Sequence, residues 1–390
     1  MEKLKRVVSK IAYSHDFSKL SLIHRSFISL LTFISSIYHL SLTTRHYLYS
    51  LGLFHKQRLP VPVISVGNLT WGGNGKTPMV EYLSNLFSNC GVCPLILSRG
   101  YGGGDEVKML QRHLMGTSAK IGSGANRAAT AAWFLEKYGY VDYSANVICK
   151  DLLFTNKVDT DDTSNKIGAA ILDDGMQHVS LVRDLDIVMV NGLMPWGNNR
   201  LIPLGPLREP LSALARADII VIHNADLVPE QDLIDIKNGI QEIKSFLPVF
   251  FSRMVPSHFF NAQNVVAKVP LSAIKGKVIF CLSALGYPIG FVMCVEKLGP
   301  LHVDQYHYSD HYMFQPKDIC TVRKRLEELH QTFDSRPIVV VTEKDYDRDR
   351  KILLELCPFN VLVLCSQLQI VAHNRNSEQR FKELVFKIWD

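Results

Sequence analysis

Apolar and polar positions follow two alternating patterns along most of the chain. After residue 60, short runs rich in β-branched residues alternate with stretches in which apolar residues recur at helical spacing. The runs are VPVISVGN, CPLILSRG, GAAILDDG, DIVMVNG, DIIVIHN, KVIFCLSAL, PIVVVTEKD and NVLVLCS. Each run meets Gly, Asn, Asp or Ser, as buried parallel strands do where a loop begins at their carboxyl ends. The alternation predicts an α/β fold built on a doubly wound, mostly parallel sheet.

The predicted strands divide into two groups. A strand, a turn and a second strand precede a fresh α/β unit that begins at about residue 275. We therefore predict a larger α/β domain at residues 59–265 and a smaller α/β domain with a C-terminal helix at residues 266–390. A chain of 390 residues with 47% hydrophobic residues can fill two cores. Residues 191–210 carry many Gly and Pro and no periodicity, which predicts a long loop of functional importance.

The first 60 residues have a different composition. Residues 1–22 are rich in serine and in cations, which is typical of an organelle transit peptide, and a solvated amphipathic helix is the alternative. Residues 23–58 are predicted to form a membrane-associated helical segment. Within it, residues 27–42 are nearly uncharged but short for a full span of roughly 20 residues. We expect this stretch to lie in the membrane interface, with an ordinary buried helix as the alternative.

Charge and cysteine usage exclude several classes of protein. The net charge of +6 is mild and scattered, so we expect no nucleic-acid partner, and a basic surface facing a membrane fits at least as well. The eight cysteines lie apart, without C-x-x-C pairs or zinc-ligand spacing. They are interpreted as buried thiols in a reducing compartment.

The stretch GNLTWGGNGKTP, residues 67 to 78, follows a predicted strand and opens a predicted helix. Glycines let successive N–H groups point at phosphate oxygens, and the helix N-terminus adds partial positive charge. In this phosphate-binding loop, Lys76 would bridge the β and γ phosphates and Thr77 would bind Mg²⁺. The predicted nucleotide-binding residues are Thr70, Trp71, Gly72, Gly73, Asn74, Gly75, Lys76 and Thr77.

A phosphate loop needs a second magnesium anchor at the end of a neighbouring strand. AAILDDGMQH supplies Asp173 and Asp174 after four apolar residues, and Asp173 is the predicted metal ligand. Transfer of the phosphoryl group to a hydroxyl also needs a base, for which Asp105, Glu106 and His311 are the candidates. Asp105 held by His311 would make a tunable base if the two domains close on each other.

These motifs together resemble one family. VPVISVGNLTWGGNGKTP, LSRGYGG, GDE, ILDDGMQH, NNRLIPLGPLREP, SDHYMF and VTEKD occur in the order and approximate spacing of tetraacyldisaccharide 4'-kinase, from about residue 23 to the end. The resemblance implies that ATP phosphorylates the 4' hydroxyl of a membrane-embedded, acylated glucosamine disaccharide lipid. It also implies two α/β/α domains joined by a β linker, with an N-terminal helix docked on the bilayer.

The resemblance also assigns roles to residues. Asp105 falls on the presumed base and His311 on the histidine that orients it, and Glu106 is placed in the metal shell. Arg200 and Arg208 are expected to pair with the 1-phosphate of the substrate. The full set of implied substrate-binding residues is Asp174, Gln177, His178, Asn198, Arg200, Arg208 and Glu209.

Departures from the family pattern leave alternatives open. Gly102 to Gly104 join RGYG directly to GDE, which shortens the loop before Asp105 and motivates a nucleotide-binding descendant without full activity. VTEKD resembles the guanine-reading element of GTPases, so a P-loop switch or metallochaperone is the rival from another class. The extra leading residues and their composition suggest a eukaryotic, mitochondrial version, with the cytoplasmic face of a bacterial inner membrane as the alternative.

Overall fold

The computed structural model describes residues 2–14, 16–100, 104–142, 165–373 and 376–389, and the side chains from residue 7 onward. The chain forms two compact units that are interleaved along the sequence. Unit 1 comprises Met1–Arg99, Leu114–Ser252 and Ile370–Asp390, and unit 2 comprises Gly100–His113 and Arg253–Gln369. The two strands β7 and β12 each continue from one unit into the other.

Unit 1 is built on a sheet with the strand order β7-β6-β5-β1-β4-β2-β3, in which every neighbouring pair is parallel. Its central strands are fully buried, as the unbroken apolar runs predicted. The strands are β1 (Val63–Gly67), β2 (Cys93–Ser98), β3 (Lys120–Ser123), β4 (Ile167–Asp173), β5 (Leu185–Asn191), β6 (Ile219–His223) and β7 (Val249–Asn261).

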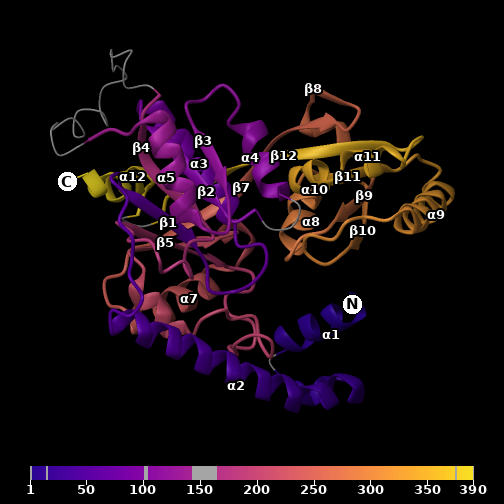
Figure 1. The fold of residues 1–390 in the computed structure, drawn as a ribbon. Coiled ribbons are helices and arrows are strands. Elements are labelled where there is room, and N and C mark those ends of the chain that lie inside the picture. The colour runs from indigo at the N-terminus through magenta and orange to yellow at the C-terminus, as the bar shows by residue number, and fades with distance from the viewer. Residues whose placement is uncertain (1, 15, 101–103, 143–164, 374–375, 390) are drawn as a thin grey trace. The chain divides into compact units, whose positions relative to one another are not determined.

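Helices cover both faces of this sheet (Figure 1). One face, which includes Val63, Leu95 and Val188, packs against α5 and α7. On the other face, Phe381 of α12 contacts Phe250 with ring centroids 5.2 Å apart, beside α3. The helices and 3-10 helices of unit 1 are α1 (Glu2–Ala12), η1 (Phe17–Lys19), α2 (Leu22–Ser50), α3 (Lys76–Asn89), α5 (Arg127–Tyr138), η4 (Leu211–Arg216), η5 (Ala225–Leu227), α7 (Glu230–Ile243), α12 (Glu378–Phe386) and η7 (Lys387–Trp389).

Unit 2 contains the strands β10-β9-β11-β12 in parallel order, followed by the distal part of β7, on which β8 pairs antiparallel. Its strands are β8 (Asn264–Val269), β9 (Val278–Ser283), β10 (His302–His307), β11 (Ile338–Thr342) and β12 (Asn360–Val371). Its helices and 3-10 helix are α4 (Asp105–His113), η6 (Leu271–Ile274), α8 (Ile289–Glu296), α9 (Pro316–Phe333), α10 (Glu343–Arg348) and α11 (Arg350–Leu354).

The predicted fold class is confirmed, because all eight apolar runs form strands and the sheet is mostly parallel. The units, however, are interleaved, whereas the sequence suggested the continuous ranges 59–265 and 266–390. Residues 100–113 leave the first α/β unit for the second, and residues 370–390 return to the first. Of the shortened loop at Gly102 to Gly104, the first two glycines lie outside the described residues.

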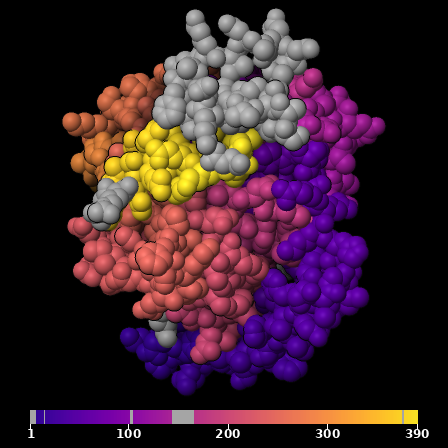
Figure 2. Space-filling model, turned by 90° about the vertical axis from the view of Figure 1, so that its left-hand side faces the viewer, coloured from indigo at the N-terminus to yellow at the C-terminus, as the bar shows by residue number. Residues whose placement is uncertain are grey.

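The N-terminal segment forms a long helix, α2, of 29 residues. It is the one helix among the described residues that is long and apolar enough to cross a membrane, by length and composition. Only Leu31 and Leu42 are buried in it, so the alternative of an ordinary buried helix is wrong. In the space-filling view, the indigo N-terminal residues lie against atoms in the colours of residues near 200 (Figure 2).

Replacing Phe381 by alanine should lower the free energy of unfolding by about 3–5 kcal/mol, because its ring is fully buried between Phe250 and Tyr82. Arg380→Ala is the matched control. Its side chain is half exposed and forms an ion pair with Glu383, also half exposed, so its loss should cost under about 1 kcal/mol. Urea unfolding measures both. Equal midpoints for the two variants would show that α12 is not a packed part of unit 1.

Candidate active site

The phosphate-binding loop connects the end of β1 to the start of α3 in unit 1. Thr70 and Asn74 close it on itself, because the Asn74 amide donates to the Thr70 carbonyl at 3.2 Å and the Thr70 hydroxyl donates to Asn74 Oδ1 at 3.3 Å. Both residues are buried. These hydrogen bonds within the loop hold it in one conformation at the N-terminus of α3, where anions bind.

Gly75 caps α3 and cannot be replaced without strain. Its φ is 77°, and a Cβ atom there would lie 2.7 Å from the ring of His223 at the end of β6. Burial lowers the pKa of His223 to about 4, so the ring is neutral at pH 7, and its Nδ1 lies 3.0 Å from the Ser252 hydroxyl. The neutral His223 ring therefore packs closely against Gly75 of the phosphate-binding loop. The sequence analysis missed this residue because β6 carries no phosphate-loop motif.

Lys76 lies at the centre of a small ionic network. Its Nζ donates to Asn68 Oδ1 at 2.8 Å and lies 2.9 Å from Asp174 Oδ1. Arg208 donates to both carboxylate oxygens of Asp174 at 2.8 Å. Burial lowers the pKa of Lys76 and Asp174 restores part of it, while Lys76 and Arg208 together hold the pKa of Asp174 below its usual range. The structure thus brings together three of the predicted site residues.

Asp173 ends β4, beside the strand that leads into the phosphate loop. The register pairs it with Val66 of β1, and its side chain is buried. Thr77 lies in the first turn of α3. A threonine hydroxyl and a carboxylate are oxygen ligands of the kind that Mg²⁺ prefers, so these two residues fit that ion.

The predicted substrate-binding residues occupy the loops beside this network. Gln177 donates to the Tyr38 hydroxyl at 3.2 Å and to the Arg208 carbonyl at 3.1 Å. Tyr38 of α2 also donates to the Arg208 carbonyl at 2.7 Å, and Arg45 donates to the Gln177 carbonyl. Helix α2 therefore contacts the same loops that carry the predicted substrate residues.

His178 is surrounded by cations. Burial lowers its pKa and four guanidinium groups lower it further, to about 4. These groups belong to Arg127, Arg183, Arg45 and Arg99. Arg127 is itself buried, donates to the Asp173 carbonyl at 2.8 Å, and has an Nε atom without a hydrogen-bond partner among the described residues. The sequence analysis missed these arginines because they come from separate segments with no shared motif.

The remaining substrate-binding predictions lie in the 191–210 loop. Arg200 is exposed. Glu209 is buried and paired with Arg216 at 2.6 Å. Asn198 donates its side-chain amide to the Ile11 carbonyl at 3.1 Å, so it faces the N-terminal segment.

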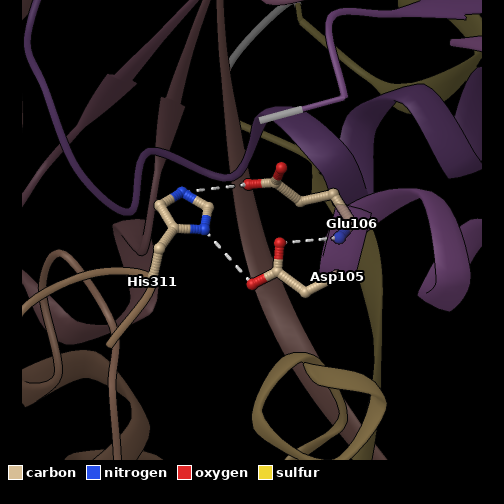
Figure 3. A group of neighbouring side chains, drawn as sticks. All are labelled: Asp105, Glu106 and His311. Carbon is tan, nitrogen blue, oxygen red and sulfur yellow. Dashed lines mark hydrogen bonds and ion pairs between the residues drawn. The ribbon is translucent and has the colours of Figure 1, made fainter. Parts of the chain in front are cut away.

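The candidate base pair lies entirely within unit 2. Figure 3 shows the Asp105 carboxylate pointing at the imidazole of His311, with Nδ1 and Oδ2 3.2 Å apart. Glu106 lies on the other side of the ring, 3.8 Å from Nε2. The sequence analysis expected this pair to need closure of two domains. It forms without closure, because α4, which begins at Asp105, belongs to unit 2.

Asp105 is fully buried and its oxygens are heavily engaged. Oδ1 accepts the N–H of Glu106 at 3.0 Å, and Oδ2 accepts two hydrogen bonds from Arg348, at 2.8 and 3.0 Å. Burial raises the pKa of Asp105, but His311, Lys344 and Arg348 outweigh it and lower the pKa to about 2. The hydrogen bond with Asp105 raises the pKa of His311. Asp105 is therefore a fixed anion, and His311 is the more exposed member of the pair.

The motif VTEKD supports this pair. Asp345 is fully buried, accepts the Thr342 hydroxyl at 2.7 Å and the Ala284 N–H at 3.0 Å, and holds Arg348 at 2.8 Å. Lys344 pairs with Glu106 at 3.0 Å. A guanine-reading aspartate has to be free to accept the N–H groups of the base. The geometry of Asp345 therefore argues against the GTPase interpretation.

A second set of ion pairs fixes the far end of α4. Arg112 donates to Asp347 at 2.8 Å and to Glu343 at 3.0 Å, and His113 Nε2 lies 2.7 Å from Glu343. Both partners are on α10. Helix α4 is thus held along its length by charges of α10, which explains why it belongs to unit 2.

Comparisons with known proteins agree with this chemistry. The family model for tetraacyldisaccharide-1-P 4'-kinase (LpxK) matches residues 27–385. The chain is 54% identical over 370 residues to a probable mitochondrial tetraacyldisaccharide 4'-kinase of Arabidopsis thaliana, which covers 95% of this chain and 93% of that protein. It is 30% identical over 391 residues to a tetraacyldisaccharide 4'-kinase of Syntrophus aciditrophicus, with 93% of each covered.

A solved structure also matches. LpxK from Aquifex aeolicus in complex with ATP superimposes with a TM-score of 0.60 and 25% identity, covering 93% of this chain and all of that one. With a family match over most of the chain and relatives at 30% identity or more along nearly its full length, the chain belongs to the tetraacyldisaccharide-1-P 4'-kinase family.

Proposed function

We propose that this protein transfers the γ-phosphoryl group of ATP to the 4' hydroxyl of a tetraacylated glucosamine disaccharide 1-phosphate, a step of lipid A biosynthesis. The observation that carries this proposal is the network of Lys76, Asp174 and Arg208 beside the phosphate loop. Family membership makes the protein a kinase. ATP is the bound nucleotide of the matching Aquifex structure.

The residues of unit 1 would handle the nucleotide. The loop from Thr70 to Thr77 would surround the phosphates with N–H groups, and Lys76 would exchange its contact with Asp174 for the β and γ phosphates. Thr77 and Asp173 would hold Mg²⁺, which neutralises charge on the phosphates when bound. Glu106 stays a predicted metal ligand, because its carboxylate lies with the Asp105 carboxylate and the His311 ring in a group that could hold a metal ion, although it also pairs with Lys344 at 3.0 Å.

The residues of unit 2 would handle the proton of the acceptor hydroxyl. Asp105 and His311 act as one group, since the carboxylate holds the ring and both are needed to define its orientation. Arg348 is a positioning residue, because its two hydrogen bonds fix the Asp105 carboxylate that holds the ring. Arg348 thereby keeps the Asp105 carboxylate ionised and in one orientation.

The cationic surroundings of His178 suit a phosphorylated acceptor. Arg127 has a buried Nε atom without a hydrogen-bond partner in the described part of the chain, and the hydrogen bonds of Arg45 and Arg127 go to carbonyl groups. The guanidinium groups gathered around His178 would attract the 1-phosphate of the lipid, although Asp173 and Asp174 offset part of the charge of Arg127. Arg208, in contrast, is already paired with Asp174, and we assign it mainly to that network.

The acceptor is a lipid, and α2 offers a surface for the membrane. Large apolar side chains follow one stripe of this helix while the opposite side contacts the loops of unit 1. The most exposed are Leu22, Ile23, Leu30, Phe33, Ile37, Leu40 and Tyr47. A stripe of this kind binds the interface of a bilayer. We place the protein at a mitochondrial membrane, as the name of the Arabidopsis relative suggests.

The direct test incubates the protein with Mg²⁺, γ-labelled ATP and a tetraacyl glucosamine disaccharide 1-phosphate in detergent. Label in the lipid is the expected result, and GTP in parallel should give far less. Tight ATP binding without labelled lipid would instead support the descendant that binds nucleotide without full activity.

Lys76→Ala should lower turnover by at least about 100-fold, because the cation that would offset charge on the transferred phosphate is lost. Lys324→Ala on the exposed surface of α9 is the control and should leave turnover unchanged. Circular dichroism checks that both variants fold. Near-normal turnover of folded Lys76→Ala would remove the phosphate loop from the mechanism.

Arg348→Met should lower kcat by about 10- to 100-fold with little change in either KM, because the base pair loses its orientation and not its substrate contacts. Arg350→Met, two residues away and exposed, is the matched control. Combining Arg348→Met with Asp105→Ala should cost little beyond Asp105→Ala alone. Fully additive losses would mean that Arg348 does not act through Asp105.

Phe33→Asp combined with Ile37→Asp should weaken binding to anionic lipid vesicles by at least about tenfold, since each side chain contributes about 1.5–3 kcal/mol when buried in an apolar phase. Thr32→Asp combined with Thr43→Asp is the control, because it adds the same two charges at exposed positions roughly 100° around the helix. Vesicle flotation measures the wild-type protein and both double variants. If the Phe33 and Ile37 variant binds as well as the control variant, this stripe does not meet the membrane.

A further inference from the structure

We propose that residues 7–14 and 16–20, here called the N-terminal clasp, stay in the working enzyme and hold the 191–210 loop in position, instead of being removed as part of a transit peptide. The family match begins only at residue 27, so the clasp lies outside it. The claim that the clasp is retained rests on its packing alone. The claim that the clasp affects catalysis rests on the proposed kinase function.

The clasp is buried on its inner side like any core element. Ile11 and Ala12 at the end of α1 are fully buried, and Leu20 is nearly so. Ile11 and Leu20 form one apolar cluster with Leu31 of α2 and Leu204 of the 191–210 loop. A presequence that is cut away after import has no need of such a cluster, and its loss would expose Leu31 and Leu204 to water.

Hydrogen bonds tie the clasp to the loop backbone. The N–H of Asn198 donates to the Ala12 carbonyl at 3.1 Å, and the Asn198 side chain donates to the carbonyls of Ile11 and Leu204, at 3.1 and 2.9 Å. Asn198 Oδ1 accepts the N–H of Arg200 at 3.1 Å. The Asn198 side chain therefore uses both its N–H donors and its acceptor oxygen, and joins Ile11 of the clasp to Leu204 and Arg200 of the loop.

The approach of the two segments also explains a glycine. Gly197 has φ 56°, and a Cβ atom there would lie 2.9 Å from the Ala12 carbonyl oxygen and 2.4 Å from Pro206. The loop conformation and the position of the clasp are thus fitted to each other. Sequence position alone gives no reason for a glycine here.

The clasped loop leads directly to the phosphate loop. The Trp71 N–H donates to the Pro206 carbonyl at 3.1 Å, and the Tyr13 hydroxyl of the clasp reaches the Trp71 carbonyl at 3.5 Å. The same loop carries Arg208, which holds Asp174. A free 191–210 loop would loosen the acceptor side of the site first, because irregular loops depend on such contacts for a single conformation.

The first experiment determines the N-terminus of the mature protein. The chain is purified from its own cells by a C-terminal tag and analysed by intact mass and N-terminal peptide mapping. A mature chain that retains Val7 is the expected result. A chain that starts after Val7 overturns the proposal, whatever the enzyme's activity.

The second experiment compares Ile11→Asp with Ser9→Asp, which puts the same charge on the exposed side of α1. Ile11→Asp should speed hydrogen exchange in residues 196–208 and raise the KM for the lipid acceptor about tenfold, with ATP affinity changed less than about twofold. Asn198→Asp, which keeps the acceptor oxygen and loses both donors, should give a smaller change in the same residues. This milder variant keeps the test valid if Ile11→Asp folds poorly.

Two outcomes of the second experiment would contradict the proposal. The first is exchange in residues 196–208 that is the same for Ile11→Asp and Ser9→Asp. The second is an equal rise of both KM values, which would indicate general destabilisation. If no variant and no wild-type protein phosphorylates the lipid, the kinase proposal fails, while the exchange and mass results still decide the clasp.

Discussion

The carboxylate of Asp174 is the interaction on which the arrangement of unit 1 depends. It accepts Arg208 on both oxygens and lies 2.9 Å from Lys76, so it joins the end of β4, the 191–210 loop and the first turn of α3. Asp174 follows β4 with φ 54° and Arg208 lies in a loop, whereas Lys76 is the first residue of α3. An anion between two cations in a partly buried place gives these loops one preferred position. Under the proposed function, nucleotide phosphates would compete for the same Lys76, so the network would rearrange when ATP binds.

Unit 2 uses the same principle for a different purpose. Asp105 is a fully buried anion that receives Arg348 and His311, and Arg348 is fixed in turn by the buried Asp345. Removing one member of such a network leaves a buried charge without compensation, which costs far more than a surface pair. The network therefore fixes the orientation of His311 more firmly than a single hydrogen bond could. VTEKD belongs to this arrangement, which is why its similarity to a guanine-reading motif misleads.

The sequence predicted the strands and the phosphate loop well, because local patterns determine both. Lys76 and Asp173 were predicted from strand and helix spacing, and the resemblance assigned Asp174 to the substrate, whereas the structure pairs Asp174 with Lys76 and Arg208. Arg127 and Arg348 were missed, since each acts on a partner that is distant in sequence and neither lies in a motif with a chemical meaning of its own. The membership of α4 in unit 2 was missed for the same reason. Its ion pairs with α10 join residues more than 200 positions apart, and no periodicity records them.

The N-terminus shows most clearly where composition stops being informative. A helix with cations on one side and apolar residues on the other describes a transit peptide and a docked helix equally well, because both need an amphipathic surface. What separates them is a complementary surface elsewhere in the chain. Here that surface is Asn198, Gly197 and Leu204, and the bond from Asn198 to the Ile11 carbonyl spans 187 positions of sequence. Lys10 of α1 is exposed while the neighbouring Ile11 is buried, so one segment can carry a targeting composition and still be part of the fold.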